Sequence, residues 1–190
     1  GLYGKPSFWK LLDDAGHGCT VIDAPYTHPE EGFKGSFVYD WGTWAHYLQP
    51  GSTPPALLRQ LESAVGRYPL GLEANDLGFE PLEAEDISRR LVTSIETKVR
   101  ATRWLMDNRP AETLLSVFGE THLAGHYCWP KGAADDRAVG DYAPMLRVYQ
   151  ALDAAIAELD DRASAKLDHG AAVRRSVPPH QPTHVSRRLR

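Results

Sequence analysis

Apolar residues recur along the chain at two spacings, one typical of helices and one of strands. The clearest helical stretch covers about residues 85–108, where Ile87, Leu91 and Ile95 recur at four-residue intervals. This spacing places apolar side chains on one face of an amphipathic helix. Acidic residues begin the stretch and Arg109-Pro110 follows it, which agrees with the start and end of a helix.

Three other segments have a similar helical pattern. A serine that can cap the first turn precedes one, a proline pair precedes the second, and glycines follow both. The third has an inward-facing series of Met145, Val148, Leu152 and Ile156. We therefore expect further helices over residues 7–15, 56–65 and about 142–160.

Short apolar runs predict the strands. Cys19 to Ile22 is one, and the run TLLSVFG, which begins at Thr113, is apolar at both odd and even positions, as in a fully buried strand. Between residues 26 and 55 only SFVYDW resembles a strand. The order of elements predicts an α/β fold with a mostly parallel sheet flanked by helices. Because so few strands are recognisable, we expect the sheet to be incomplete, or some strands to escape detection.

Composition restricts the class of protein. The chain has 190 residues, 42% of them hydrophobic and 24% charged, which suits one globular domain. A net charge of -4 argues against a nucleic-acid surface, and no apolar run is long enough for a membrane span. We expect neither partner. No secretory leader is visible at the start of the sequence, and the compartment is unknown, with a cytoplasmic location favoured. Cys19 and Cys128 are interpreted as small buried residues.

The last part of the chain differs from the rest. From Arg162 onward arginine, proline and histidine are frequent and no apolar period is visible, which predicts a basic, disordered tail over 162–190. Residues 1–161 would then form the folded domain. The chain begins without methionine, and we interpret it as a fragment or a processed chain; a shifted reading frame near Asp161 would also explain the tail.

Two histidines follow the second apolar run, in LLSVFGETHLAGHYCWP. His122 and His126 are four residues apart, so in a helical turn their imidazoles lie on one side and can share a metal ion. Ligands in open α/β sheets bind at the carboxyl ends of strands, where this turn would lie. Zinc, which histidine nitrogens bind well, is the metal we expect. The alternative is a pair of surface histidines without a ligand.

This segment resembles the metal-binding turn of the type I phosphodiesterase/nucleotide pyrophosphatase family, within the alkaline phosphatase superfamily. Most members have D-x-x-G-H after a buried strand, and one branch has E-x-H-x-x-G-H-x-x-W. The segments PSFWKLLDDAGHGCTVIDAPYTHP, FKGSFVYDWGTWAH and YQALDAAIAEL are also similar to family segments, in the same order. The resemblance spans residues 6–159 and implies an alkaline-phosphatase-like fold.

The resemblance implies a metal-dependent hydrolase of phosphate esters or phosphodiesters, acting on a small phosphorylated substrate such as a nucleotide. Family members hold two metal ions, usually zinc, and His126 matches one ligand while His122 replaces an aspartate. A family D-H-G turn completes the second site. Asp168-His169-Gly170 is either that turn, with Asp168 and His169 as further ligands, or a chance match in a polar tail.

The family's nucleophile, a threonine or serine, should lie on a strand before Pro6, so its position is unknown here and we expect little or no activity from this chain alone. The alternative interpretation is a non-catalytic, truncated or degenerate module of the same family. Glu120 either orients a histidine or is solvated. His28 and His46 either contact substrate or belong to an ordinary surface loop.

Overall fold

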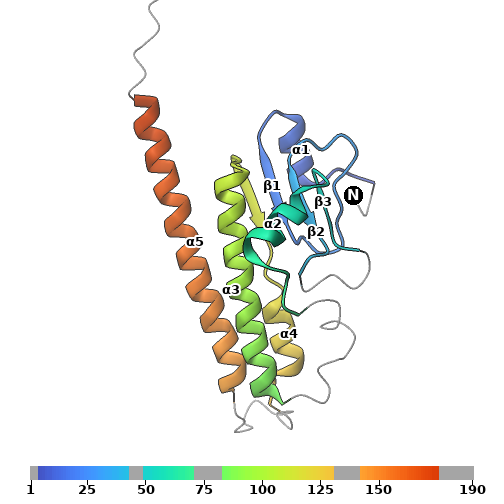
Figure 1. Cartoon of the computed structure of the whole chain (residues 1–190), viewed down its shortest axis with the longest axis vertical. Coiled ribbons are helices and arrows are strands. Elements are labelled where there is room, and N and C mark those ends of the chain that lie inside the picture. The colour runs from blue at the N-terminus through green and yellow to red at the C-terminus, as the bar shows by residue number, and fades with distance from the viewer. Residues whose placement is uncertain (1–3, 43–48, 71–82, 131–141, 176–190) are drawn as a thin grey trace, which may run out of the picture.

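The computed structural model describes residues 4–42, 49–70, 83–130 and 142–175 and contains a four-stranded sheet, with α3 (Ala84–Asn108) and α5 (Ala143–Arg175) to one side of it in the view of Figure 1. Within these residues the strand order is β3-β2-β1-β4. β1 pairs in parallel with β2 on one side and β4 on the other, and β3 pairs antiparallel with β2. The strands are β1 (Cys19–Ile22), β2 (Ser36–Tyr39), β3 (Gly51–Thr53) and β4 (Thr113–Ser116).

The sheet is mixed, so the expected α/β class is confirmed but the expected mostly parallel sheet is wrong. Residues 40–50 connect β2 to β3, and this connection is shorter than the dozen or so residues that a parallel crossover requires. The strand-like SFVYDW segment is confirmed as β2. β3 escaped detection because its sequence, Gly-Ser-Thr, has no apolar side chain.

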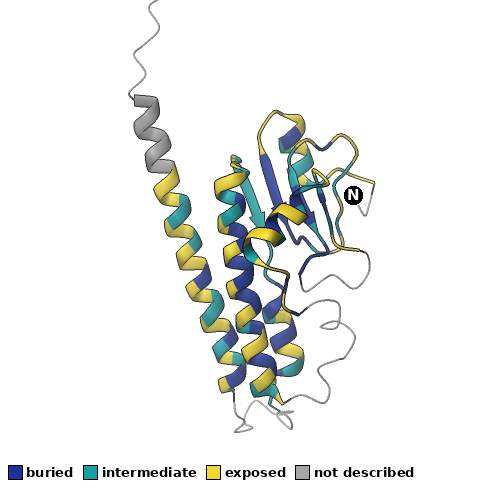
Figure 2. Cartoon of the chain, viewed as in Figure 1, coloured by how far each residue is buried: buried dark blue, intermediate teal, exposed yellow. Residues whose placement is uncertain are grey.

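Helices cover both faces of the sheet. Val21 and Phe37 pack on the side of α1, whereas Ile22 and Val38 pack on the side of α2 and α3. This alternation follows from the period of two along a strand. Figure 2 shows the continuous burial of β1, which lies between two other strands. The helices are α1 (Phe8–Asp14), α2 (Leu57–Val65), α3 (Ala84–Asn108), α4 (Glu120–Tyr127) and α5 (Ala143–Arg175).

β4 is an edge strand, although its sequence predicts a fully buried one. All four of its residues are only half-buried (Figure 2). Its inner side pairs with β1, and Ser116 Oγ lies 2.9 Å from Thr102 Oγ1 on α3. The strand is therefore where the sequence expects it along the chain, but among the described residues no strand pairs with its outer side and buries it.

α5 is longer than the sequence predicts. It continues past Asp161 to Arg175, which contradicts the expected disorder of residues 162–175. Lys166 Nζ donates to the Met106 carbonyl at 2.6 Å and lies 2.8 Å from Asp107, and Arg162 also pairs with Asp107. These contacts with the end of α3 stabilise a helical extension that has little apolar periodicity. Residues 176–190 lie outside the described part of the chain.

Two further expectations concern individual residues and membrane spans. Cys19 and Cys128 are both buried and free, as expected, and burial raises the pKa of the Cys128 thiol to about 11. Among the described helices, none combines the length and the apolar character needed to cross a membrane.

Candidate metal-binding helix and buried ionic cluster

The two predicted histidines converge on the surface of α4. The Nε2 atoms of His122 and His126 are 3.1 Å apart, and their rings meet nearly edge to face. Both side chains are exposed. Nitrogens bound to one tetrahedral zinc ion would lie roughly 3.3 Å apart, given zinc–nitrogen bonds of about 2.0–2.1 Å. The same separation also suits one hydrogen bond between two imidazoles.

α4 begins immediately beyond the carboxyl end of β4. Val117 donates its N–H to the Ile22 carbonyl at 3.2 Å, which continues the pairing with β1 for one residue past the strand. Gly119 then precedes the helix, and its carbonyl accepts the first backbone hydrogen bonds of α4. The histidines therefore lie at the edge of the sheet where ligands of open α/β folds collect.

The structure separates the remaining predicted ligands from this pair. Asp168 and His169 belong to the last turns of α5. Figure 1 places that end of α5 at the opposite end of the molecule from α4. Their side chains lie outside the described part of the structure. Within the part that is described, no group of three or more histidine, cysteine, aspartate or glutamate side chains is arranged to hold a metal ion.

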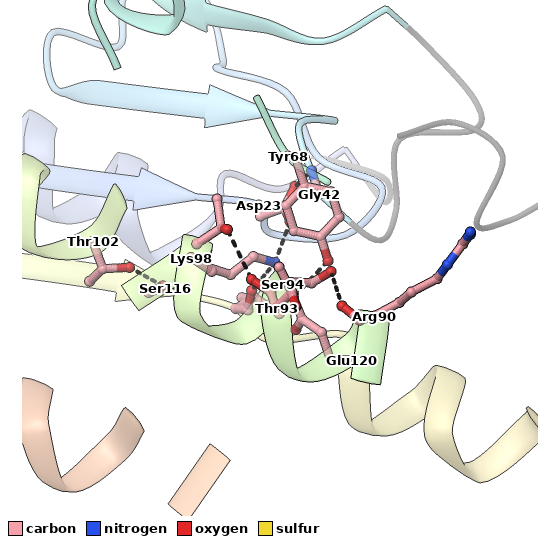
Figure 3. A network of polar contacts seen from close by, with 12 residues as sticks. Asp23, Gly42, Tyr68, Arg90, Thr93, Ser94, Lys98, Thr102, Ser116 and Glu120 are labelled. Atoms are coloured by element: carbon pink, nitrogen blue, oxygen red, sulfur yellow. Dashed lines mark hydrogen bonds and ion pairs between the residues drawn. The ribbon is translucent and has the colours of Figure 1, made fainter. Parts of the chain in front are cut away.

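Glu120, the first residue of α4, is part of a buried ionic cluster (Figure 3). Its side chain is fully buried, as are those of Asp23 and Lys98. Lys98 Nζ lies 2.6 Å from Asp23 Oδ2 and 3.7 Å from Glu120 Oε1, and it donates to the Val117 carbonyl at 2.9 Å. Glu120 is therefore buried rather than solvated, and its hydrogen bond is with Tyr68 rather than with a histidine, which corrects both sequence interpretations.

Tyr68 completes this cluster. Its hydroxyl donates to Glu120 Oε1 at 2.7 Å, and its ring lies 5.3 Å from Lys98 Nζ, within cation–π range. Burial, and then the Glu120 carboxylate, raise the pKa of Tyr68 well above its usual value. Burial alone would lower the pKa of Lys98, but Asp23 and Glu120 outweigh it and raise that pKa. The fold thus favours the protonated form of both groups.

Backbone geometry adapts to the cluster at Asp23 and Gly42. Asp23 follows β1 with a φ of 62°, a left-handed conformation that is uncommon outside glycine. Its Oδ1 accepts the Gly42 N–H at 2.9 Å. A Cβ on Gly42 would come within 1.8 Å of Asp23 Oδ2, so only glycine fits beside the carboxylate.

Lys98 shows which signal the sequence analysis missed. It stands three residues after Ile95 and seven after Leu91, on the apolar face of α3. A lysine is almost never fully buried unless it is paired. Its position therefore indicates a buried anionic partner, although the sequence does not reveal which carboxylates these are.

The loop histidines have different outcomes. His28 Nε2 lies 3.4 Å from the buried Asp40 carboxylate, and its ring packs 4.6 Å from that of Tyr39. It also lines an open groove of about 1050 Å³ beside α1, together with Trp9 and Tyr26. His46 lies outside the described residues. The structure does not decide between substrate contact and an ordinary surface loop for His28, so both interpretations stay predictions.

Comparison of the chain with protein-family models, with curated proteins and with solved structures gives no match.

Proposed function

We propose that His122 and His126 bind one divalent metal ion, with zinc preferred, and that this metal serves a phosphate-ester or phosphodiester hydrolase of alkaline-phosphatase type. The observation that carries the proposal is the 3.1 Å separation of their Nε2 atoms at the carboxyl end of β4. The donor set suits the metal, because neutral imidazole is a favoured ligand of zinc.

The chemistry of the site follows from its exposure. Two imidazoles leave coordination positions for water or for substrate oxygens, and a bound divalent ion can polarise a phosphoryl oxygen and offset its negative charge. The chain's own contribution is to hold the imidazoles in place. Glu120 and the buried face of α4, which includes Leu123 and Ala124, fix this helix against the body of the fold.

Zinc titration followed by calorimetry tests the metal site. We expect one zinc ion per metal-free chain, and we expect His126→Ala to weaken binding at least about tenfold because a chelating pair becomes a single ligand. His17→Ala is the matched control, since His17 is an exposed histidine paired with Glu112 at 2.7 Å on other elements. Equal zinc affinity in His126→Ala and the unsubstituted chain would contradict the proposal.

Phosphate-ester recognition needs a separate measurement, because we expect little or no hydrolysis from this chain alone. Dimethyl phosphate is a suitable probe, and its ³¹P signal should broaden with the zinc-loaded chain but not with the metal-free chain or His126→Ala. Zinc binding without an effect on dimethyl phosphate would keep the metal site but reject the phosphate-ester role. That result would favour the non-catalytic module.

A further inference from the structure

The outer edge of β4 has unpaired backbone groups. Thr113 and Val117 donate their N–H groups toward β1, at 3.1 Å and 3.2 Å. Neighbouring residues of a strand direct their hydrogen-bonding groups to opposite sides, so Leu114 and Ser116 direct theirs away from β1. No other described residue bonds to these outward groups. A row of unpaired donors and acceptors is a template for another strand.

An apolar groove runs beside this edge. It has a volume of about 430 Å³ and lies among α3, α5 and β4. Thr102 and Ser116 supply hydroxyls to it, and Asp160 supplies a carboxylate. The apolar lining residues are Met106, Leu114, Phe118, Leu152, Ile156 and Leu159. An extended chain that paired with β4 could place alternate side chains in this groove, as strand addition requires.

The sequence of β4 does not protect an exposed edge. Natural edge strands carry lysine, proline or inward-pointing charges that prevent pairing, whereas TLLSVF has none of these. Its apolar residues on both faces are typical of an interior strand. On the facing helix, Ile156 remains 58% exposed. Both walls of the groove therefore have the character of surfaces that another segment covers.

The position of α5 favours a single strand over a second copy of this chain. α5 packs against α3 and lies beyond the β4 edge of the sheet (Figure 1). A second copy paired through its own β4 would bring its own α3 over that strand, into the space that α5 occupies. An extended segment without a helical layer has no such conflict.

The other segments within residues 1–190 are poor candidates for this strand. Residues 43–48 stand in the sequence between β2 and β3, the two strands farthest from β4 in the sheet order. The longer segments outside the described residues contain proline or a charged residue in every five-residue stretch, and such residues disfavour an added apolar strand. Those segments are residues 71–82, 131–141 and 176–190.

From these observations we propose that the β4 edge binds one extended segment from outside residues 1–190, which adds a fifth strand to the sheet. Alternate apolar side chains of that segment contact Leu152, Ile156 and Leu159. Asp160, which is exposed, favours a cationic residue near one end of the segment. This inference does not depend on the metal site.

Amide hydrogen exchange of the full chain tests the proposal. The probe is an eight-residue peptide that alternates valine with threonine and has a lysine at each end. At saturation, exchange at the Leu114 and Ser116 amides should slow at least about tenfold, whereas Leu115, which already faces β1, should change little. The matched control peptide carries N-methyl groups on the alternate amides that would pair with β4, and it should not slow exchange.

Two protein variants sharpen the test. Ile156→Lys places a charge in the groove and should weaken binding of the probe at least about tenfold. Leu146→Lys is the control, because Leu146 is an exposed residue of the same helix outside the groove. The proposal is wrong if the peptide does not bind, if the N-methylated peptide acts equally, or if both variants bind alike. Slowed exchange that depends on protein concentration without peptide would also overturn it, in favour of a second copy.

Discussion

The histidine pair and the glutamate of α4 differ above all in their exposure to solvent. His122 and His126 face water, where they can meet a ligand but contribute little to folding. Glu120, on the same helix, is fully buried with Lys98 and Asp23. Exposed groups keep their hydration, whereas buried charges lose it and depend on one another. The histidines, which resemble a site in the sequence, are thus distinct from the buried charged residues, whose removal should lower the free energy of unfolding most.

Lys98→Ala should have the largest effect on stability. It leaves the Asp23 and Glu120 carboxylates buried without their cation, and removing one partner of a buried ion pair costs about 3–5 kcal/mol. Urea unfolding at pH 7 measures this loss. Arg89→Ala on the same helix is the control, because its pairs with Glu85 and Asp86 are exposed and should contribute at most about 1 kcal/mol. Equal losses in the two variants would show that burial of the Lys98 pair has no special cost.

The sequence predicted the helices better than the contacts between side chains of different segments. The apolar period of α3 was sufficient to place that helix at 84–108, because its face is long and regular. The cluster joins Asp23, Tyr68, Lys98 and Glu120 from four separate segments, and no local spacing relates them. Only Lys98, on an apolar face, gave a local sign of it. The histidine pair was predictable because both members lie within one turn of helix.

The strands show a second limit of sequence interpretation. β1 and β4 were recognisable from their apolar runs, but such runs do not report which neighbours a strand will have. TLLSVF has the composition of an interior strand and occupies an edge. The end of α5 was missed for the opposite reason, since Arg162 and Lys166 hold it to Asp107 by charge rather than by an apolar face.

Tyr68→Phe should have an intermediate effect. It removes the hydrogen bond to the buried Glu120 carboxylate, whose Oε2 already lacks a hydrogen-bond partner among the described residues. Hydrogen bonds to charged groups contribute about 1.5–3 kcal/mol, and we expect a loss in this range from urea unfolding at pH 8. Tyr149→Phe, at an exposed tyrosine of α5, should change stability by less than about 0.5 kcal/mol.

The same variant should alter the response to alkaline pH. Because the fold raises the pKa of Tyr68, the native state keeps this proton above pH about 10, where the unfolded state loses it. Stability from this proton is therefore complete below pH about 10 and falls as pH rises through the higher native pKa. The stability difference between the unsubstituted chain and Tyr68→Phe should shrink between pH 10 and 11. A constant or growing difference would contradict the raised pKa.

His122→Ala should have the smallest effect in metal-free solution. Its side chain is exposed, so unfolding in the presence of a chelator should change by less than about 0.5 kcal/mol. If the pair binds zinc, the same substitution should matter once zinc is added. At a concentration 100 times the dissociation constant, a ligand that binds only the native state raises the free energy of unfolding by about 2.7 kcal/mol. Only the unsubstituted chain should gain this stability at that concentration. A large loss in chelator would mean that His122 supports the fold, and equal zinc stabilisation of both proteins would place the metal elsewhere.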